Sequence, residues 1–254
     1  MARRIITNKI WLRLSSTFSE IGIRKTPRLR EQIEGMFWRA RVGAPWRDIP
    51  WEFGKWETIY RKFRRWSLNG TLHLLFEALE GHVDLEVGYI DSTSIRAHQH
   101  AHGVLNGEDA KIGVSRGGPT TKIHCVVDRN AKPIAIQITA GNCHDAPVGE
   151  EIVDELNEAT EELVGDKGYD SDKLRLQAEK LGIRPVIPRR RNSSKPARGF
   201  HKAKYRRRHV VENFFCKLKR FRAVATRYDK SVNSFFGSVL ICIIRLWITD
   251  FRQL

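Results

Sequence analysis

Long hydrophobic runs are missing from this sequence of 254 residues, of which 29% are charged. The longest apolar run, VLICIIRLWI at 239–248, falls well short of the roughly 20 residues that a membrane span needs, and it contains Arg245. No apolar signal-peptide core follows the basic residues after Met1. We therefore expect a soluble, cytoplasmic protein with no membrane partner, and a buried helix at 239–248.

Cysteine is also scarce. The four cysteines are widely spaced and form no CxxC pair, which argues against a disulfide frame or a cysteine zinc site, so we interpret them as reduced packing residues. His98, His100 and His102 alternate, and three imidazoles on one face of a strand could hold zinc. A polar loop is the simpler interpretation of this segment, and we favour it.

Acidic residues are absent from 180–211, where the net charge is +12. The net charge is +8 over 1–82, −9 over 83–179 and +5 over 212–254, which gives +16 for the chain. An acidic centre between basic arms suits a site that holds cations while its surroundings bind a polyanion. This pattern predicts nucleic-acid binding, and a basic protein of ribosomal type is the alternative.

Residues 1–82 are predicted to form a small helical domain. One helix is expected over LREQIEGMFWRARV, ending at Gly43, and a second from near Lys55. In the second, KWETIYRKFRRW, aromatic residues recur on one face and basic residues, including Lys62 and Arg65, cover the remainder. The pair is either a helix-turn-helix whose basic face contacts DNA or an ordinary amphipathic helix with a solvated basic face.

From about residue 84 the pattern changes to short strands, LEVGYIDSTSI, TTKIHCVVD and KPIAIQITA, which predict an antiparallel meander. A helix is expected at 146–159, then the strand LVG, a helix over 172–181 and the strand IRPVIP. This element order is that of a ribonuclease-H-like α/β fold, a mixed sheet with helices on its faces. We therefore predict a ribonuclease-H-like domain over 83–254, with a mobile basic loop at 189–204.

The stretch YRRRHVVENFFCKLKRF at 205–221 is predicted to form one helix. At about 100° per residue, Tyr205, Arg208, Glu212 and Lys219 share one stripe beside an apolar face. Taken alone, this stripe is explained as well by a solvated face with an i,i+4 pair between Arg208 and Glu212.

Two aspartates lie where predicted strands give way to polar sequence. Asp91, in YIDSTSIRAHQH, shares a strand face with half-buried residues, and Asp166 follows the apolar run LVG in LVGDKGYDS. Each is either a site acid or a residue that merely ends its strand and begins a turn. Asp145, after His144, is expected to cap the helix that follows it.

These residues carry a resemblance to a known family. The spacing Tyr205-x2-Arg208-x3-Glu212-x6-Lys219 matches the signature of DDE transposases. The blocks YIDSTSIRAHQH, GGPTTKIHCVVD, ITAGNCHDAP and LVGDKGYDS resemble those of the insertion sequence five family, in the same order, and GAPWRDIPWEFGKWETIYRKFRRWSLNG is similar to its N-terminal domain. An ordered set of five blocks is hard to obtain by chance.

The resemblance implies a bacterial transposase that binds terminal inverted repeats and performs strand cleavage and strand transfer. Its catalytic and metal-binding acids would be Asp91, Asp166 and Glu212. Three converging carboxylates repel one another, and two magnesium ions would neutralise them and activate a water or a DNA 3′-hydroxyl. Because the ligands are oxygens, we expect manganese to substitute for magnesium.

The resemblance also implies the partners. We expect double-stranded DNA, with nucleoid association when bound, and at least a homodimer, since two transposon ends must be brought together. Tyr205, Arg208 and Lys219 are associated in the family with the site and the DNA near it. We expect the cations of the basic loop to be disordered until DNA binds: Arg189, Arg190, Arg191, Lys195 and Arg198.

Two other functions remain open. One is a ribonuclease-H-like nuclease of another kind, such as a resolvase, and the other is a catalytically silent DNA-binding derivative. A resolvase has no need of the five blocks, and a decayed derivative is expected to lack one of the three acids or a stretch of chain.

Overall fold

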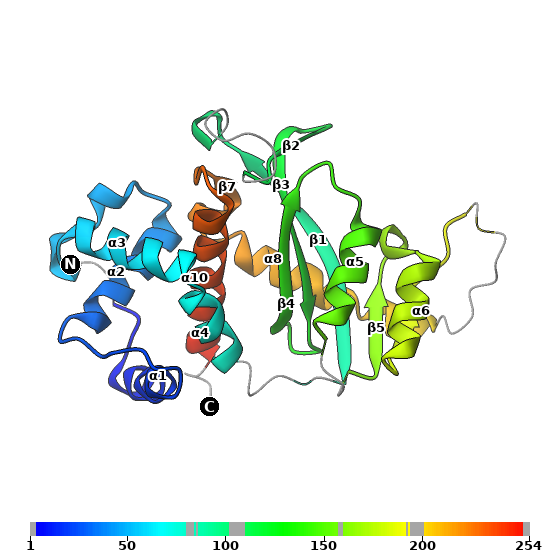
Figure 1. Cartoon of the computed structure of the whole chain (residues 1–254), viewed down its shortest axis with the longest axis horizontal. Coiled ribbons are helices and arrows are strands. Elements are labelled where there is room, and N and C mark those ends of the chain that lie inside the picture. Colours follow the sequence, from blue (N-terminus) through cyan, green and yellow to red (C-terminus); the bar gives the residue numbers. More distant parts are fainter. Residues whose placement is uncertain are drawn as a thin grey trace. The chain divides into compact units, whose positions relative to one another are not determined.

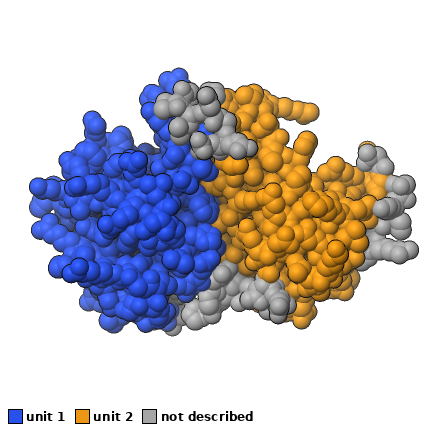
Figure 2. Space-filling view, in the orientation of Figure 1, with its two compact units in different colours: residues 1–82, 97–110, 218–254 blue, residues 83–96, 111–217 orange. Residues whose placement is uncertain are grey.

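The computed structural model describes residues 4–79, 84, 86–101, 110–156, 160–191, 193 and 201–250. The chain forms two compact units, coloured separately in Figure 2. Residues 1–82, 97–110 and 218–254 form the helical unit, and residues 83–96 and 111–217 form the sheet unit. The sequence suggested a single boundary near residue 82, whereas the chain returns to the helical unit twice.

The helical unit begins as its sequence predicts. Helix α2 (Leu29–Val42) ends at Gly43, which adopts the left-handed conformation with φ +71° that favours glycine, and α3 (Trp56–Leu68) starts after Lys55. The connection between them, residues 43–55, is longer than the three or four residues of a helix-turn-helix. The pair therefore departs from that motif. The other elements are α1 (Asn8–Glu20), η1 (Trp46–Asp48), η2 (Trp51–Phe53), α4 (Thr71–Leu79), η3 (Gln99–Ala101), α9 (Arg222–Ala225), β7 (Thr226–Arg227) and α10 (Val232–Asp250).

Helix α10 is the core of the helical unit, which confirms the buried helix predicted at 239–248. The segment Val232–Thr249 is long and apolar enough to cross a membrane by length and composition alone, yet 61% of it is buried, as in core helices of soluble proteins. Polar bonds fix its position, since Arg39 of α2 donates to the Ser238 hydroxyl at 2.9 Å and Arg245 donates to the Phe37 carbonyl at 3.0 Å.

The sheet unit is a mixed sheet, as predicted. Strands β3 and β4 form antiparallel pairs in the meander, with β3 also paired to β1, while β5 runs parallel to both β1 and β6. The order is β2-β3-β1-β5-β6, and β4 also pairs with β3, along Thr121–Val127. The strands are β1 (Val87–Ala97), β2 (Gly113–Ser115), β3 (Gly118–Val127), β4 (Pro133–Ala140), β5 (Glu162–Gly165) and β6 (Arg184–Val186).

Helices cover both faces of this sheet. Helices α5 (Asp145–Asp154) and α6 (Asp172–Lys180) lie in front of the strands in Figure 1, and α8 (His209–Leu218) lies behind them. Side chains of α5 and α6, including Ile152 and Leu174, share a buried core with Ile90 and Leu163 of the strands. The predicted ribonuclease-H-like fold is therefore confirmed, although α5 ends several residues before the position that the sequence suggested.

The helix predicted over 205–221 is interrupted. A short helix, α7 (Lys202–Arg206), ends in a turn at Arg207 and Arg208, and α8 starts at His209. Like charges crowd the segment before the break, and the side chains of Lys204 and Arg207 turn to partners on the sheet. The predicted single stripe is therefore wrong. Tyr205 precedes the turn, Glu212 lies in the first turn of α8, and Lys219 follows the end of α8.

The four cysteines are free thiols. Cys125 and Cys242 are buried, as expected of packing residues, but Cys216 is exposed, so the packing interpretation is wrong there.

Candidate active site

Asp91 and Asp166 are brought together by the register of two parallel strands. Ile90 of β1 pairs with Gly165 of β5, so each aspartate is the next residue along its strand. Neighbouring strands lie about 4.8 Å apart, so two acids that are 75 positions apart in the sequence become neighbours at the point where β5 ends.

Backbone groups orient both carboxylates. Asp91 Oδ1 accepts from the Ser92 amide at 2.8 Å. Asp166 Oδ1 accepts from the Gly168 amide at 2.7 Å and thereby caps the turn η5 (Lys167–Tyr169). Each acid is therefore held by its own chain, with its second oxygen left for another partner.

Arg208 joins the third acid to the first. One guanidinium nitrogen donates to Asp91 Oδ2 and the other to Glu212 Oε1, each at 2.5 Å. The Asp91 and Arg208 side chains are 18% and 21% exposed, and Glu212 is 52% exposed. The i,i+4 pair that the sequence allowed is therefore present, but the same guanidinium also reaches across to the sheet.

Partial burial changes the pKa values of Asp91 and Arg208. Desolvation raises the pKa of Asp91, the nearby Asp166 charge adds to the increase, and Arg208 together with the Ser92 amide opposes it. Desolvation alone would lower the pKa of Arg208, but Asp91 and Glu212 outweigh it and the pKa is raised. The acids thus create a negative potential that one protein cation only partly offsets.

Three carboxylates are the oxygen donors that hard divalent cations prefer, and Arg208 already places a positive charge between two of them. The donor chemistry therefore fits a divalent cation. Among the described residues, however, no three His, Cys, Asp or Glu side chains lie close enough together to hold a metal ion. Glu212 would have to exchange Arg208 for the metal.

The histidine hypothesis for zinc is wrong for the described residues. Strand β1 ends at Ala97, so His98 and His100 do not alternate along a strand. Their rings lie 4.6 Å apart, and His98 Nδ1 accepts from the His100 amide at 3.2 Å. His102 lies outside the described residues.

A polar network lies one residue beyond Asp91, under helix α5. Asp145 Oδ1 accepts from the Ser92 hydroxyl at 2.9 Å and from Lys122 Nζ at 3.0 Å. Asp145 was expected to cap α5, but His144 occupies the N-cap position, and Asp145 is the first helical residue. Its carboxylate is engaged by the sheet, so the capping prediction is wrong.

His124 and Tyr169 complete this network. His124 Nδ1 lies 3.3 Å from the Tyr169 hydroxyl, and its Nε2 lies 2.9 Å from the Thr139 hydroxyl. Burial lowers the pKa of His124 to about 4, so the ring is neutral near pH 7, although Asp145 opposes the decrease. Lys122 and His124 were not among the predicted site residues. Their signal was two ionisable side chains, two positions apart, in the otherwise apolar strand segment KIHCVV.

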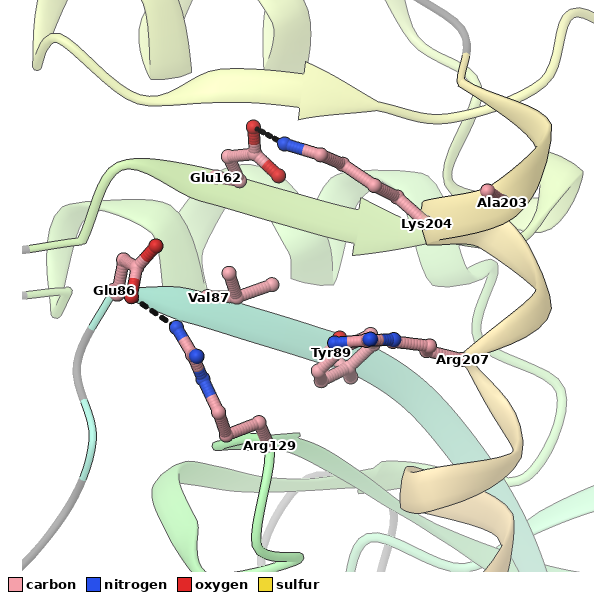
Figure 3. A pocket seen from close by; sticks show the side chains of 8 residues that line it. All are labelled: Glu86, Val87, Tyr89, Arg129, Glu162, Ala203, Lys204 and Arg207. Atoms are coloured by element: carbon pink, nitrogen blue, oxygen red, sulfur yellow. Dashed lines mark hydrogen bonds and ion pairs between the residues drawn. The ribbon is translucent and has the colours of Figure 1, made fainter.

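The sheet also anchors α7, and with it Arg208. Lys204 forms an ion pair with Glu162 of β5, and Arg207 hydrogen-bonds with Tyr89 of β1. Figure 3 shows the side chain of Lys204, from α7, pointing to Glu162 and that of Arg207, from the turn after α7, pointing to Tyr89. These contacts define a small pocket whose acids, Glu86 and Glu162, are already paired with cations of the protein.

The basic loop differs from its prediction where it is described. Arg189 pairs with Asp170 at 3.2 Å and with Asp172 at 2.7 Å, and Arg190 donates to the carbonyls of Lys167 and Gly168. Both side chains therefore have partners within the protein, supplied by the Asp170 carboxylate and the loop after Asp166. Arg191 is exposed, and Lys195 and Arg198 lie outside the described residues.

Two sequence families match this chain. The family described as "Transposase DDE domain" matches residues 83–247 and includes all three acids. The chain belongs to the DDE transposase family. Residues 6–76 match a second family, described as "Putative transposase of IS4/5 family".

Individual proteins are also similar to this chain. The chain is 31% identical over 131 residues to the "Putative transposase for insertion sequence element IS6501" of Brucella ovis, and the match covers 51% of this chain and 98% of that protein. It is 36% identical over 80 residues to the protein y4sN of Sinorhizobium fredii, covering 32% of this chain and 64% of y4sN, which is less than two thirds of that relative's length.

One solved structure shares the fold of this transposase-family chain. It is the piggyBac transposase in a synaptic complex with hairpin DNA, with a TM-score of 0.53 and 12% identity. The similarity covers 97% of this chain and 73% of that chain. At this identity the comparison supports the ribonuclease-H-like fold alone.

We predict that His124 makes the protein sensitive to acid. In the folded protein the pKa of His124 is about 4, below its ordinary value of 6.5. Between these two pH values the His124 ring is therefore protonated in the unfolded state and neutral in the folded state. Stability from this group is complete above pH 6.5 and falls as the pH decreases, by about 2 kcal/mol at pH 5. Urea unfolding at pH 7 and pH 5 measures the loss, which His124→Gln should reduce. Equal losses in the parent and the variant would contradict this assignment.

Proposed function

We propose that this protein is a DNA transposase that cleaves DNA strands at the ends of an insertion sequence and joins them to target DNA. The observation that carries the proposal is that Asp91 and Asp166 follow paired residues of neighbouring strands, while Arg208 forms ion pairs with both Asp91 and Glu212. Membership of the DDE transposase family supports this reaction over that of a resolvase.

The three acids would hold divalent cations, for which magnesium, with manganese as a substitute, is the choice that oxygen ligands favour. Two such ions, when bound, supply Lewis-acid activation of a water or 3′-hydroxyl nucleophile and stabilisation of the leaving oxygen. Asp91 and Asp166 come from the rigid sheet, so their carboxylates are positioned before DNA arrives. Glu212 is the most exposed of the three acids and would complete the set of ligands if Arg208 released it.

Arg208 has a second role in this proposal. In the metal-free protein its guanidinium offsets the repulsion between Asp91 and Glu212. Once cations take over this task, Arg208 is free to contact a DNA phosphate. Tyr205 on α7 and Lys219 after α8 are candidates for contacts with DNA near the site, together with Arg189, Arg190 and Arg191.

We further propose that the helical unit binds duplex DNA, including the terminal inverted repeats. A shallow groove between the start of α2 and helix α3 is lined by Arg28, Arg61, Lys62 and Arg65, and the part of the chain that the structure describes adds no acidic residue to its lining. We call it the basic groove. Desolvation and the Arg65 charge lower the pKa of Lys62, so an incoming phosphate would relieve like-charge repulsion here. A homodimer or higher oligomer is expected, because two ends must meet.

The central test replaces each acid with its amide. Asp91→Asn, Asp166→Asn and Glu212→Gln should each reduce magnesium-dependent cleavage of a labelled transposon end below detection, because each removes a metal-binding charge while keeping the shape. Binding to the same end should remain. Asp154→Asn, on the exposed side of α5, is the control and should cleave normally. Cleavage by any triad variant at the parental rate would contradict the proposed site, and an inactive parent with intact DNA binding would identify a silent derivative.

Arg208→Ala tests the exchange between guanidinium and metal. Removing this charge should tighten manganese binding about tenfold, measured by titration calorimetry without DNA, because Asp91 and Glu212 lose their competing partner. Cleavage should fall at the same time. Arg184→Ala, which removes an exposed cation that pairs with Glu162, should leave manganese affinity unchanged. Unchanged or weaker manganese binding by Arg208→Ala would contradict the exchange.

The basic groove is tested by salt dependence. The triple variant Arg61→Ala, Lys62→Ala, Arg65→Ala should weaken duplex binding and lower the slope of log affinity against log salt by about 2 to 3, close to one unit per phosphate contact. The variant Lys173→Ala, Lys180→Ala, Arg184→Ala reduces the net charge equally but lies in the sheet unit, and its slope should stay near that of the parent. Equal slopes for parent and groove variant would exclude this surface.

A further inference from the structure

Helix α3 separates two grooves of different chemistry. At about 100° per residue, Thr58, Arg61, Lys62 and Arg65 occupy one arc of the helix and face the basic groove. Trp56, Tyr60, Phe63 and Arg64 lie on the opposite arc and line a second groove of about 690 Å³. We call this second one the aromatic groove. The charged lining residues of the basic groove are cations, and the aromatic groove combines cations with aromatic rings.

The rings of the aromatic groove are held in place yet remain accessible. Trp46 is fixed by Phe63, whose ring centre lies 4.6 Å away, and by Tyr60 at 5.4 Å. Trp56 and Tyr60 are only partly buried, and Tyr228 is 46% exposed. The Tyr228 ring stacks on His98 with centres 4.4 Å apart. Trp56, Tyr60 and Tyr228 thus leave part of their ring surface accessible to solvent.

The charge of this groove is positive. Among the described residues, the one acid that lines it is Asp229, which is nearly buried and is already bound by Arg39 at 3.4 Å and by the Ser238 hydroxyl at 3.1 Å. Three further lining cations, Arg47, Arg64 and Lys230, are exposed. The guanidinium of Arg47 lies 5.9 Å from the Trp56 ring centre, so cation and ring are adjacent.

A duplex hides the faces of its bases and offers only phosphates to such a surface, so the rings would add nothing to duplex binding. An unpaired nucleotide offers both a base that stacks on an aromatic ring and a phosphate that binds a cation. We propose that the aromatic groove binds an unpaired stretch of DNA, with a base stacked on Trp56 and its phosphates held by Arg47, Arg64 and Lys230. This inference rests on the proposed DNA-binding function of the helical unit and adds a second class of substrate.

The test measures the affinity of the full-length protein for three fluorescent probes: a 12-nucleotide oligothymidine, an abasic strand of equal length and charge, and a duplex. Trp56→Leu should weaken oligothymidine binding about tenfold, since one stacked base is lost, and change duplex binding less than twofold. Trp56→Phe retains a ring and should keep most of the affinity. Tyr228→Ala, at an exposed position, should also weaken the single strand selectively.

The basic groove provides the matched control. Arg61→Ala, Arg65→Ala should weaken the duplex more than oligothymidine, the reverse of Trp56→Leu. The parent should bind the abasic strand about as weakly as Trp56→Leu binds oligothymidine. Parental oligothymidine affinity in both ring variants, with unchanged melting temperatures, would overturn this inference while leaving duplex binding intact. Failure of the parent to bind any of the three probes would overturn the proposed DNA-binding function as well.

Discussion

Repulsion among carboxylates is the constraint on which this site depends. Asp91 and Asp166 are neighbours because of the register between β1 and β5, and partial burial makes the charge of Asp91 costly. Arg208 offsets part of that cost by bridging Asp91 and Glu212. In the proposed exchange, a divalent ion would replace this guanidinium, because it offers more charge to the same carboxylates.

The surrounding structure holds both partners in this exchange. On one side of the sheet, Asp145, Lys122 and Ser92 form hydrogen bonds directly after Asp91 and limit the movement of β1. On the other, Lys204 and Arg207 attach α7 to the strands and so fix the turn that carries Arg208. Glu212 is the least constrained of the acids, because it lies exposed in the first turn of α8. Backbone amides thus hold both aspartates, whereas Glu212 is exposed and held by Arg208.

The sequence predicted the strands and the order of elements, because these follow from periodicity and from an ordered set of motifs. The assignment of Asp91, Asp166 and Glu212 as catalytic acids stays a prediction. It failed where tertiary partners decide. The break between Arg206 and His209 depends on the acid and phenol that Lys204 and Arg207 find on the sheet, which no helical pattern reveals. The sequence placed Arg189 and Arg190 in a loop but could not show that Asp170 and the Lys167 carbonyl would bind their side chains. Helix α10 likewise packs in the same unit as residues 1–82, although it lies near the other end of the sequence. Local composition does not predict such a long-range contact.

The two units differ in their chemistry. Helix α3 of the helical unit carries cations and aromatic rings that line two grooves, and the sheet unit carries the acids. Crystals of the DNA-free protein soaked in manganese test the central exchange most directly, because the ion gives an anomalous signal. We expect manganese density bonded to oxygens of Asp91 and Asp166, with the Arg208 guanidinium moved away from Asp91. Manganese bound elsewhere, or absent from these acids while Arg208 still bridges Asp91 and Glu212, would contradict the exchange.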